Sequence, residues 1–557
     1  MPEDIPVSDL IQIAIDRSPW RKEGNEKWFT QEASLREILE AEALGLYSHP
    51  KVFHFIKEKF FDKLFEQPDL YGVVIIRGPR RIGKTSTLEY LIREKLAEGC
   101  NPKSFFYISL DDDRLLDVLE RRRLLKEFLS ALIKQNEEVK PLIIVLDEVT
   151  FYKGWGRAIK NLIDEGSIGQ GVAVVATGSY SMELSSAKSE LSGRFGPLGE
   201  SVGGDFFFPP RRFIEVAETA LGSEFQQFIS TQFGLPGRRL GFLEYLGGYQ
   251  TEADRVRYGY DQKVEEFSRK FYESLHWILE TYKFSGGYPR AIFEAIKSKR
   301  SGALNISEPR YRDDIFNLLV TDCRKFGLEE ETLRLILTKI TAPAMRMSSN
   351  LDAIKPNPTI KQDDFLKYID YLENSGLFMR VPDVYLPEQI NVSGRSVTSS
   401  FERPKLVVAD PAVFIAIYLC SRNIAPTIEK INAVLDDTMQ GHLLEATIIS
   451  HLRFLPHTQP FENINYVLYR DGAVETELAD ALVWYVNHNS EFVTIPMEVK
   501  YSRDLDEGQI KNQAVALKKA FGVKRLVVVC NSKEASFKFK VTEDYAIISA
   551  ELFLLLF

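Results

Sequence analysis

The feature that most constrains this chain is a glycine-containing segment at residues 78–85, which directly follows an apolar run at residues 71–76. The segment has the pattern G-x-x-x-x-G-K-[ST], and the run before it has the composition of a buried parallel strand. In such a loop the glycines let backbone N–H groups turn inward around phosphates. A strand, a phosphate-binding loop and a helix in this order predict an α/β domain with a nucleotide site.

Each position of the loop has an expected part in that site. Lys84 would reach the terminal phosphates, and the hydroxyl of Thr85 would bind Mg²⁺. The residues expected to contact the nucleotide are Gly78, Pro79, Arg80, Arg81, Ile82, Gly83, Lys84, Thr85 and Ser86. Because short glycine patterns also arise by chance, the assignment needs a second signal elsewhere in the chain.

That second signal is an apolar strand at residues 141–146 that ends in two carboxylates, Asp147 and Glu148. We expect Asp147 to hold the Mg²⁺, usually through water, and Glu148 to polarise the attacking water. An Asp-Glu pair after a strand is otherwise often the start of a solvated loop. Behind a phosphate-binding loop, the pair predicts that the protein hydrolyses ATP, with ATP and Mg²⁺ as its cofactors.

Three later segments offer further polar groups. The strand at residues 171–176 leads into Thr177 and Ser179, which are candidate contacts of the γ-phosphate or the attacking water, although simple strand termination also explains them. Arg194 is a candidate for stabilising transition-state charge within the chain or across a subunit boundary, but a surface arginine after a glycine is the commoner case. A Gly-Gly-x-Pro turn would place Pro289 or Arg290 on the nucleotide, and turn formation alone also accounts for it.

Over about residues 45–300, these segments resemble AAA+ ATPases of the origin-recognition and STAND-like branch. In that family G-P-R-R-x-G-K-T is followed by L-D-E-V, T-G-S, L-x-G-R and G-G-x-P-R, and the matching residues here are 78–85, 146–149, 177–179, 191–194 and 286–290. Members also tend to carry P-L-S-F-x-E-F, where this chain has arginines at positions 211 and 212. The resemblance implies a parallel-sheet ATPase core followed by a helical lid.

Composition describes an ordinary globular protein, with 45% hydrophobic and 27% charged residues. Because no apolar stretch reaches the ~18 residues that span a bilayer, and the acidic N-terminus is not a signal peptide, we expect a cytoplasmic location and no membrane partner. The four cysteines show neither metal-ligand spacing nor a disulfide framework. A net charge of −9 argues against non-specific coating of nucleic acid, but short basic runs remain candidates for phosphate contact or solvated helix faces: residues 121–123, 211–212, 238–239 and 297–300.

Residues 305–410 change character. A helix at residues 364–372 ends at Asn374, Ser375 and Gly376, and a strand is predicted at residues 377–381. A helix, a stop and a strand are typical of a winged helix, a module that often binds DNA. Because this helix is acidic, a winged helix used only for packing is an equally good interpretation.

The C-terminal part of the chain holds a second candidate site. Strands are predicted at residues 465–469, 477–486, 493–501 and 525–530, after a helix at residues 441–449. Side chains alternate along a strand, so Glu498 and Lys500 share one face. If Asp480 lies on the adjacent strand, two carboxylates would hold Mg²⁺ while Lys500 orients or activates water, and Glu445 would supply a further ligand.

These four positions resemble the PD-(D/E)xK nuclease fold, which the same branch of ATPases often carries at its C-terminus. One departure is Ala479, which stands where the nuclease pattern has proline. The E-x-K pattern is also frequent on exposed strands, where alternating charges keep an edge soluble. The resemblance implies a nuclease-like fold and leaves cleavage open. Gln513 is either a DNA contact or an ordinary surface glutamine.

The expected fold class is therefore α/β: a P-loop AAA+ parallel-sheet domain with a helical lid, a winged-helix domain and a C-terminal α/β restriction-endonuclease-like domain. The expected divisions are a leader at 1–45, the ATPase core at 46–209, the lid at 210–304, the winged helix at 305–410 and the nuclease-like domain at 411–557. One function that follows is an ATPase coupled to DNA, with or without Mg²⁺-dependent cleavage. The alternative is a STAND-like switch whose nuclease-like domain serves binding or assembly. DNA is the expected partner, and a homo-oligomer is a further candidate.

Overall fold

The computed structural model describes most of the chain, in two compact units: Met1–Pro209 with Asn374–Gly376, and Pro210–Glu373 with Leu377–Phe557. The described residues are 6–22, 33–43, 45, 47–179, 187–233, 236–250, 258–293, 309–341, 354–357, 360–384, 390–391, 396–398, 400–422, 436–453, 464–471, 474–487 and 489–557. Within these ranges, no helix is both long enough and apolar enough to cross a membrane.

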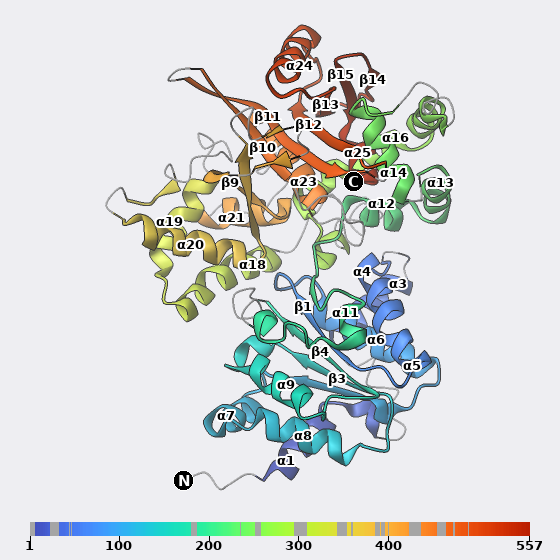
Figure 1. Ribbon diagram of the computed structural model, residues 1–557, viewed down its shortest axis with the longest axis vertical. Coiled ribbons are helices and arrows are strands. Elements are labelled where there is room, and N and C mark those ends of the chain that lie inside the picture. Colours follow the sequence, from blue (N-terminus) through green and yellow to red (C-terminus); the bar gives the residue numbers. More distant parts are fainter. Residues whose placement is uncertain are drawn as a thin grey trace. The chain divides into compact units, whose positions relative to one another are not determined.

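The first unit is built on a parallel five-stranded sheet with the strand order β2-β3-β4-β1-β5 (Figure 1). The strands are β1 (Gly72–Arg77), β2 (Phe105–Ser109), β3 (Leu142–Asp147), β4 (Val172–Gly178) and β5 (Asp205–Phe207). The parallel sheet that the apolar runs predict is confirmed. These runs are continuously apolar because helices cover both faces of the sheet.

One face of this sheet packs on helices that lie before and between the strands. Side chains of Val73, Phe106, Ile144 and Val174 lie in one core cluster with residues of α1, α7, α8 and α9. Figure 1 shows α5 and α6 on the other side of the sheet. The helices of this unit are α1 (Val7–Asp16), η1 (Pro19–Arg21), α3 (Ala33–Ala43), α4 (Lys51–Ile56), η2 (Lys57–Asp62), α5 (Lys63–Glu66), α6 (Lys84–Ala97), η3 (Pro102–Ser104), α7 (Asp113–Arg122), α8 (Leu125–Gln135), η4 (Val149–Phe151), α9 (Trp155–Asp164) and α11 (Gly196–Glu200).

The second unit begins with helices and continues into a mixed eight-stranded sheet of order β14-β15-β13-β12-β11-β10-β6-β9. The helices are α12 (Phe213–Leu221), α13 (Ser223–Phe233), α14 (Pro236–Leu246), α16 (Tyr260–Ser285), α18 (Pro309–Asp322), η5 (Cys323–Phe326), α19 (Glu330–Ile340), α20 (Gln362–Asn374), α21 (Pro411–Ser421), α23 (Asp437–Arg453), α24 (Glu507–Phe521) and α25 (Ala550–Leu556). The strands are β6 (Phe378–Val384), β9 (Ser400–Val408), β10 (Ile464–Asp471), β11 (Val474–Val486), β12 (Phe492–Tyr501), β13 (Leu526–Asn531), β14 (Phe539–Val541) and β15 (Tyr545–Ser549), and β7 (Ile390–Asn391) pairs separately with β8 (Ser396–Val397).

The large sheet is continuous across residue 410, where the sequence suggests a domain boundary. Strands β6 and β9 come from the segment with the winged-helix pattern, and β10 to β12 come from the nuclease-like segment. Strand β6 pairs with β9 on one side and with β10 on the other. The winged-helix and nuclease-like domains stay predictions, but their strands share one sheet.

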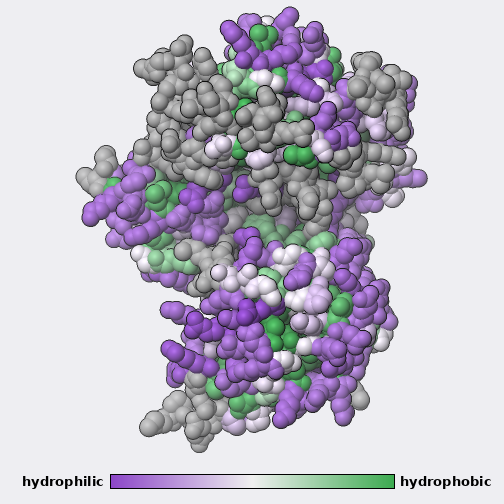
Figure 2. Space-filling view, in the orientation of Figure 1, coloured by the Kyte–Doolittle hydropathy of each residue, from purple (hydrophilic) through white to green (hydrophobic). Residues whose placement is uncertain are grey.

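The sequence-based view of residues 211 and 212 as a surface basic run is wrong, because both arginines are only 4% exposed. The guanidinium of Arg212 donates a hydrogen bond to the backbone oxygen of Phe557, and burial lowers its pKa to about 10. Next to it, the N–H of Phe213 donates to Nε2 of His451 at 2.9 Å. These arginines therefore tie the start of α12 to the rest of the second unit. By contrast, Arg121 and Arg123 are exposed, and Figure 2 shows hydrophilic residues in the region of α7.

A buried pair links α16 to α25. The Nδ1 atom of His276 lies 2.7 Å from Oε1 of Glu551, and the same oxygen accepts a hydrogen bond from Asn531 at 2.9 Å. Burial alone would lower the pKa of His276, but the Glu551 carboxylate outweighs it and the pKa is raised above its ordinary value.

This pair predicts a pH-dependent stability. A raised histidine pKa means that the stabilisation is complete below the unfolded pKa of about 6.5 and is lost as pH rises through the folded pKa. We expect His276→Gln to lower the free energy of unfolding more at pH 6 than at pH 9, as measured by urea denaturation. The exposed His54 gives the control substitution His54→Gln. An equal loss at both pH values would contradict the ion pair.

Candidate functional site

The loop between β1 and α6 has a backbone that few residues tolerate. Gly83 has a φ of 99° and Arg81 a φ of 64°, both in the left-handed region. At Gly78 an added Cβ would lie 2.5 Å from the carbonyl oxygen of Phe208, so this position needs glycine. The first N–H groups of α6, which begins at Lys84, have no acceptor within the helix. An exposed helix N-terminus of this kind binds anions.

Lys84 lies inside this loop and is 6% exposed. Its ammonium group donates hydrogen bonds to the carbonyl oxygens of Gly78 at 2.8 Å and Pro79 at 2.9 Å. Burial lowers the pKa of Lys84, and the nearby carboxylates of Glu148 and Asp147 oppose that effect. The ammonium group of Lys84 therefore donates to neutral carbonyl groups in the loop. A charged phosphate oxygen would be a stronger acceptor and would replace these carbonyl groups favourably.

Asp147, the last residue of β3, accepts hydrogen bonds on both carboxylate oxygens. The hydroxyl of Thr85 donates to Oδ2 at 2.7 Å, and the hydroxyl of Tyr107 donates to the same oxygen. The hydroxyl of Thr177 and the N–H of Glu148, at 3.0 Å, donate to Oδ1. We call Asp147 with these four donors the Asp147 network. It fixes the direction in which the carboxylate points.

Strand alternation explains why this network forms. Phe106, Ile144 and Val174 face the core cluster, so Tyr107 on β2, Asp147 on β3 and Thr177 on β4 face the opposite side of the sheet. The parallel register brings the carboxyl ends of these strands together. Tyr107 was not among the residues that the sequence suggested for this site, although a polar residue near the carboxyl end of a neighbouring strand is a usable signal.

Glu148 lies beside this network in a left-handed conformation, with a φ of 52°. The hydroxyl of Ser179 donates to Oε1 of Glu148 at 3.2 Å. Burial raises the pKa of Glu148, and the charges of Lys84 and Arg80 partly oppose that rise. The site therefore brings together a carboxylate with a raised pKa, a lysine and an arginine at the end of a phosphate-binding loop.

The residues present fit a magnesium ion. Mg²⁺ prefers hard oxygen ligands, and the Thr85 hydroxyl and the Asp147 carboxylate already lie 2.7 Å apart. The Thr85 hydroxyl donates its hydrogen bond to that carboxylate. Thr85 and Asp147 are thus the residues that would hold the ion.

Arg194 lies at the other end of the sheet. Its Nε donates to Asp164, the last residue of α9, at 2.7 Å. The carbonyl of Phe195 accepts the N–H of Val73, near the start of β1, at 2.9 Å. Both contacts are at the amino ends of the strands, away from Glu148. A role for Arg194 across a subunit boundary stays a prediction.

Pro289 and Arg290 belong to the second unit and follow the end of α16. In the same turn, the N–H of Gly287 donates to Asp410 at 2.7 Å, and its carbonyl accepts from the N–H of Arg211 at 2.8 Å. These bonds account for the Gly-Gly turn within the second unit. A contact of Pro289 or Arg290 with the nucleotide stays a prediction.

A second carboxylate cluster lies in the second unit. One oxygen atom each of Glu445 on α23 and of Glu477 and Asp480 on β11 lie within 4.8 Å of one another. The N–H of Val499 donates to Oδ2 of Asp480 at 2.7 Å. Burial raises the pKa of Asp480 well above its ordinary value, and the surrounding carboxylates raise it further. Three close carboxylates of this kind are a donor set that fits a divalent cation.

An ammonium group already lies among these carboxylates. Lys405 on β9, whose side chain is 3% exposed, donates to Glu445 at 2.7 Å and also to Glu477. Burial alone would lower the pKa of Lys405, but the carboxylates, Glu445 foremost, raise it well above its ordinary value. The sequence suggested neither Lys405 nor Glu477 for this site.

Glu477 was missed because β11 is irregular. In a regular strand, residues three apart such as Glu477 and Asp480 face opposite sides. Here the pairing of β11 with β10 shifts twice around residues 477–482, and the consecutive residues Leu478 and Ala479 both pack on the core beneath α24. The bulge leaves Glu477 and Asp480 close together on the other side. Lys405 was missed because it comes from a strand 40 residues before Glu445.

Glu498 and Lys500 do share one face of β12, and the Lys500 ammonium donates to the Glu498 carboxylate. Gln513 on α24 donates to Oε2 of Glu498 and to the carbonyl of Leu478, both at 2.8 Å. Gln513 is therefore not a free surface glutamine, and a contact of Gln513 with DNA stays a prediction. Glu498 as a metal ligand stays a prediction.

The cluster predicts a large effect of removing Lys405. We expect Lys405→Met to lower the free energy of unfolding by about 3–5 kcal/mol, because it leaves buried carboxylates without their cation. Added Mg²⁺ or Mn²⁺ should restore more stability to this variant than to the wild type. Urea denaturation measures both effects, with Lys511→Met on the exposed side of α24 as the control. A loss no larger than that of the control would contradict the ion pairs.

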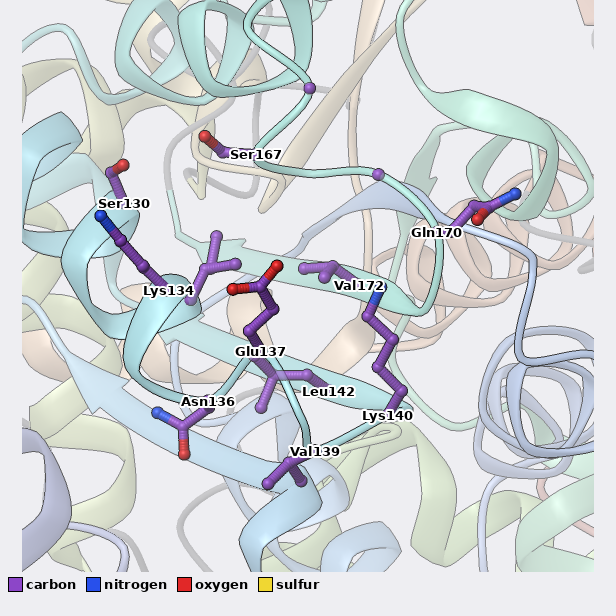
Figure 3. Close-up of a pocket in the computed structure, with 13 residues that line it drawn as sticks. Ser130, Lys134, Asn136, Glu137, Val139, Lys140, Leu142, Ser167, Gln170 and Val172 are labelled. Atoms are coloured by element: carbon purple, nitrogen blue, oxygen red, sulfur yellow. The ribbon is translucent and has the colours of Figure 1, made fainter.

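A hollow of about 350 Å³ lies elsewhere, at the amino ends of β3 and β4 (Figure 3). Leu142 and Val172 line it together with polar residues of α8 and of the loops around the strands, including Lys134 and Glu137. The phosphate loop follows the carboxyl end of β1, and Asp147 lies at the carboxyl end of β3, so this hollow is not the nucleotide site.

Comparison with known proteins assigns the central part of the first unit. Residues 71–203 match a protein family described as an AAA domain. The first unit thus contains an AAA domain with a P-loop and a parallel five-stranded sheet, which confirms that part of the resemblance seen in the sequence. The chain is also similar to “Uncharacterized protein MJ1637” of Methanocaldococcus jannaschii, with 29% identity over 132 residues. That match covers 24% of this chain and 26% of the relative, so the chain matches about a quarter of the relative's length.

Several solved structures align with longer stretches of this chain, but with low sequence identity and low TM-scores. The Walker-type ATPase PABY2304 of Pyrococcus abyssi aligns with a TM-score of 0.36 and 13% identity, over 65% of this chain and 95% of that one. The Aeropyrum pernix ORC2 protein in its ADPNP–ADP complexes aligns with a TM-score of 0.31 and 14% identity, over 71% and 94% of the two chains. The Aeropyrum pernix ORC1 protein in complex with DNA aligns with a TM-score of 0.30 and 12% identity, over 70% and 94%. TM-scores below 0.5 do not establish a common overall fold.

Proposed function

We propose that this protein binds and hydrolyses ATP with Mg²⁺ at the P-loop of its AAA domain, and that the nucleotide state controls how the second unit binds DNA. The observation that carries the first half is the Asp147 network, in which Thr85 and Asp147 face each other beside Glu148. Transfer of a phosphoryl group to water needs a hydroxyl and a carboxylate that hold Mg²⁺, here Thr85 and Asp147. It also needs a second carboxylate that acts on the water, here Glu148, and all three lie at the end of a phosphate-binding loop. The proposal that the second unit binds DNA rests on the pattern of carboxylates and lysine in that unit, at Asp480, Glu498 and Lys500.

The residues of the loop have distinct parts in this reaction. The N–H groups at the start of α6 bind phosphate oxygens, and Lys84 exchanges its carbonyl partners for the terminal phosphates. Thr85 and Asp147 would hold Mg²⁺, which supplies charge neutralisation at the β- and γ-phosphates. Arg80, whose charge already acts on Glu148 together with that of Lys84, is a further candidate to oppose developing negative charge.

Glu148 orients the attacking water and accepts its proton. The raised pKa of Glu148 brings this carboxylate closer to the pH at which it works, which favours proton transfer. Its hydrogen bond from Ser179 holds it in one direction. A γ-phosphate that draws the Ser179 hydroxyl away would release Glu148 toward the water, so that the base becomes available when ATP is bound.

The phosphate-loop assignment predicts a strong effect of Lys84→Ala. We expect ATP turnover to fall by roughly 10²-fold or more, since a buried cation at the transferring phosphate is lost. Lys134→Ala, an exposed lysine in the same unit, should leave turnover unchanged. Steady-state phosphate release measures both, and wild-type turnover by Lys84→Ala would show that the loop is not the catalytic site.

Glu148→Gln should separate catalysis from binding. We expect turnover to fall by roughly 10²-fold or more while ATP binding, followed with a fluorescent analogue, is retained. Because its pKa is raised, wild-type activity should be lost, as pH falls, at a pH above the ordinary glutamate value of about 4.3. Glu138→Gln makes the same chemical change at an exposed position. Equal effects of the two variants would exclude Glu148 as the base.

The role of the second unit has two versions. In the first, Glu445, Asp480 and Glu498 hold Mg²⁺ and Lys500 orients or activates water for DNA cleavage. In the second, the same fold binds DNA or assembles without cleavage, as part of an ATP-dependent switch. The ion pair of Lys405 supports the second version, because its buried ammonium group neutralises the Glu445 carboxylate.

Cleavage of linear and branched DNA with Mg²⁺, in the presence and absence of ATP, distinguishes these versions. If the domain cleaves, Asp480→Asn and Lys500→Ala should each abolish cleavage, whereas Lys511→Ala on the exposed side of α24 should not. If it is a switch, the wild type cuts none of these substrates, and ATP changes its affinity for DNA in a gel-shift titration. Cleavage that survives both substitutions would exclude the proposed active site.

A further inference from the structure

Residues 7–22 form part of the first unit. Helix α1 packs on the same core cluster as the sheet, and η1 follows it along β2. Among the strands that the structure describes, β2 pairs with β3 alone and is therefore an edge strand of the sheet. An edge strand leaves N–H and C=O groups without strand partners. In this chain the segment at residues 17–21 supplies such partners.

These contacts are specific hydrogen bonds with the backbone of β2. The N–H of Tyr107 donates to Oγ of Ser18 at 2.9 Å, and the Ser18 hydroxyl in turn lies 3.4 Å from the Tyr107 carbonyl oxygen. The indole N–H of Trp20 donates to the carbonyl of Phe105 at 3.2 Å. Ser18 is fully buried and Trp20 is 5% exposed. The backbone of Phe105 and Tyr107 is therefore fixed from outside the sheet.

A second link holds the segment after β2. Arg17 donates to Oδ2 of Asp112 at 2.6 and 2.8 Å. Asp112 is the N-cap of α7 and accepts the N–H of Arg114 at 3.1 Å. The hydrogen bonds from both arginines hold the pKa of Asp112 well below its ordinary value. The same short N-terminal segment thus contacts β2 and the first turn of the helix that follows it.

Tyr107 connects this segment to the candidate magnesium position. Its hydroxyl donates to Oδ2 of Asp147, the oxygen that also accepts the Thr85 hydroxyl. Burial and the Asp147 charge raise the pKa of Tyr107 well above its ordinary value, so the hydroxyl stays a donor. When Thr85 turns to a metal ion, the bond from Tyr107 can remain, and the carboxylate then keeps its direction without reorganisation.

We propose that Tyr107 is a positioning residue that holds Asp147 in its metal-binding orientation, and that Ser18 at the N-terminal segment fixes the backbone of Tyr107 for this purpose. This inference rests on the proposed ATP hydrolysis. It changes the expected role of residues 7–22 from a polar leader to a working part of the ATPase domain. Neither residue touches the nucleotide in this account, since both act through Asp147.

The full-length variant Tyr107→Phe tests this role, with Tyr90→Phe as a matched control. Tyr90 is also buried, and its hydroxyl also donates to a carboxylate, that of Glu42 at 2.9 Å, but away from Asp147. In Tyr107→Phe we expect the Mg²⁺ concentration for half-maximal ATP hydrolysis to rise by about tenfold or more, the size expected for one hydrogen bond to a charged group. Affinity for ATP in EDTA should not change. Ser18→Ala should shift the Mg²⁺ requirement in the same direction by a smaller factor.

Direct Mn²⁺ binding to the ADP-bound protein, followed by electron paramagnetic resonance, gives a readout that does not depend on turnover. A wild type that hydrolyses no ATP would overturn the proposed function, while a weaker Mn²⁺ affinity of Tyr107→Phe would still support the positioning role. Equal Mn²⁺ affinity in the wild type, Tyr107→Phe and Tyr90→Phe would overturn the role. Thermal unfolding shows whether Tyr107→Phe is misfolded. If it is, the Mn²⁺ affinity of Ser18→Ala is the deciding measurement, and an affinity equal to that of the wild type rejects the inference.

Discussion

The carboxylate of Asp147 is the group on which the rest of the first unit depends. Four hydrogen bonds reach its two oxygens, from the phosphate loop, from both neighbouring strands and from the next residue in the chain. A buried carboxylate with this many donors is held in one direction. Because the donors come from α6, β2 and β4, the carboxyl edge of the sheet must keep its register for the carboxylate to point toward Thr85.

Two features hold the register of the strands at this edge: the packing of the sheet on its core, and the hydrogen bonds of the N-terminal segment with β2. Core side chains on one face leave the alternate residues of β2, β3 and β4 for the site, and α6 begins on that side at Lys84. In the described part of the chain, no strand lies beyond the edge strand β2, and residues 18–20 donate to and accept from its backbone instead. Glu148 then takes a left-handed conformation directly after a carboxylate that cannot turn.

Local motifs in the sequence were enough to predict the parallel sheet, the phosphate loop and the carboxylates at the end of β3. Their geometry depends on residues that are adjacent along the chain, such as Gly83 and Lys84. Tyr107 was missed because its contact with Asp147 depends on strand order and register, which no local pattern contains. Glu477 was missed because a bulge in β11 changes the side of the sheet to which neighbouring residues point. Lys405 was missed because it lies far from Glu445 along the chain. The arginines at positions 211 and 212 looked like surface charge because burial cannot be inferred from residue type alone.

The most direct test of this account is a Mn²⁺ titration of the ADP-bound full-length protein, monitored by electron paramagnetic resonance, for the wild type and Asp147→Asn. The account predicts one Mn²⁺ bound at the nucleotide site of the wild type, and an affinity at least about tenfold weaker in Asp147→Asn, since one carboxylate contact is worth more than 1.4 kcal/mol. An unchanged affinity in Asp147→Asn would contradict it, because the carboxylate that the surrounding strands hold in place would then have no part in binding the metal ion.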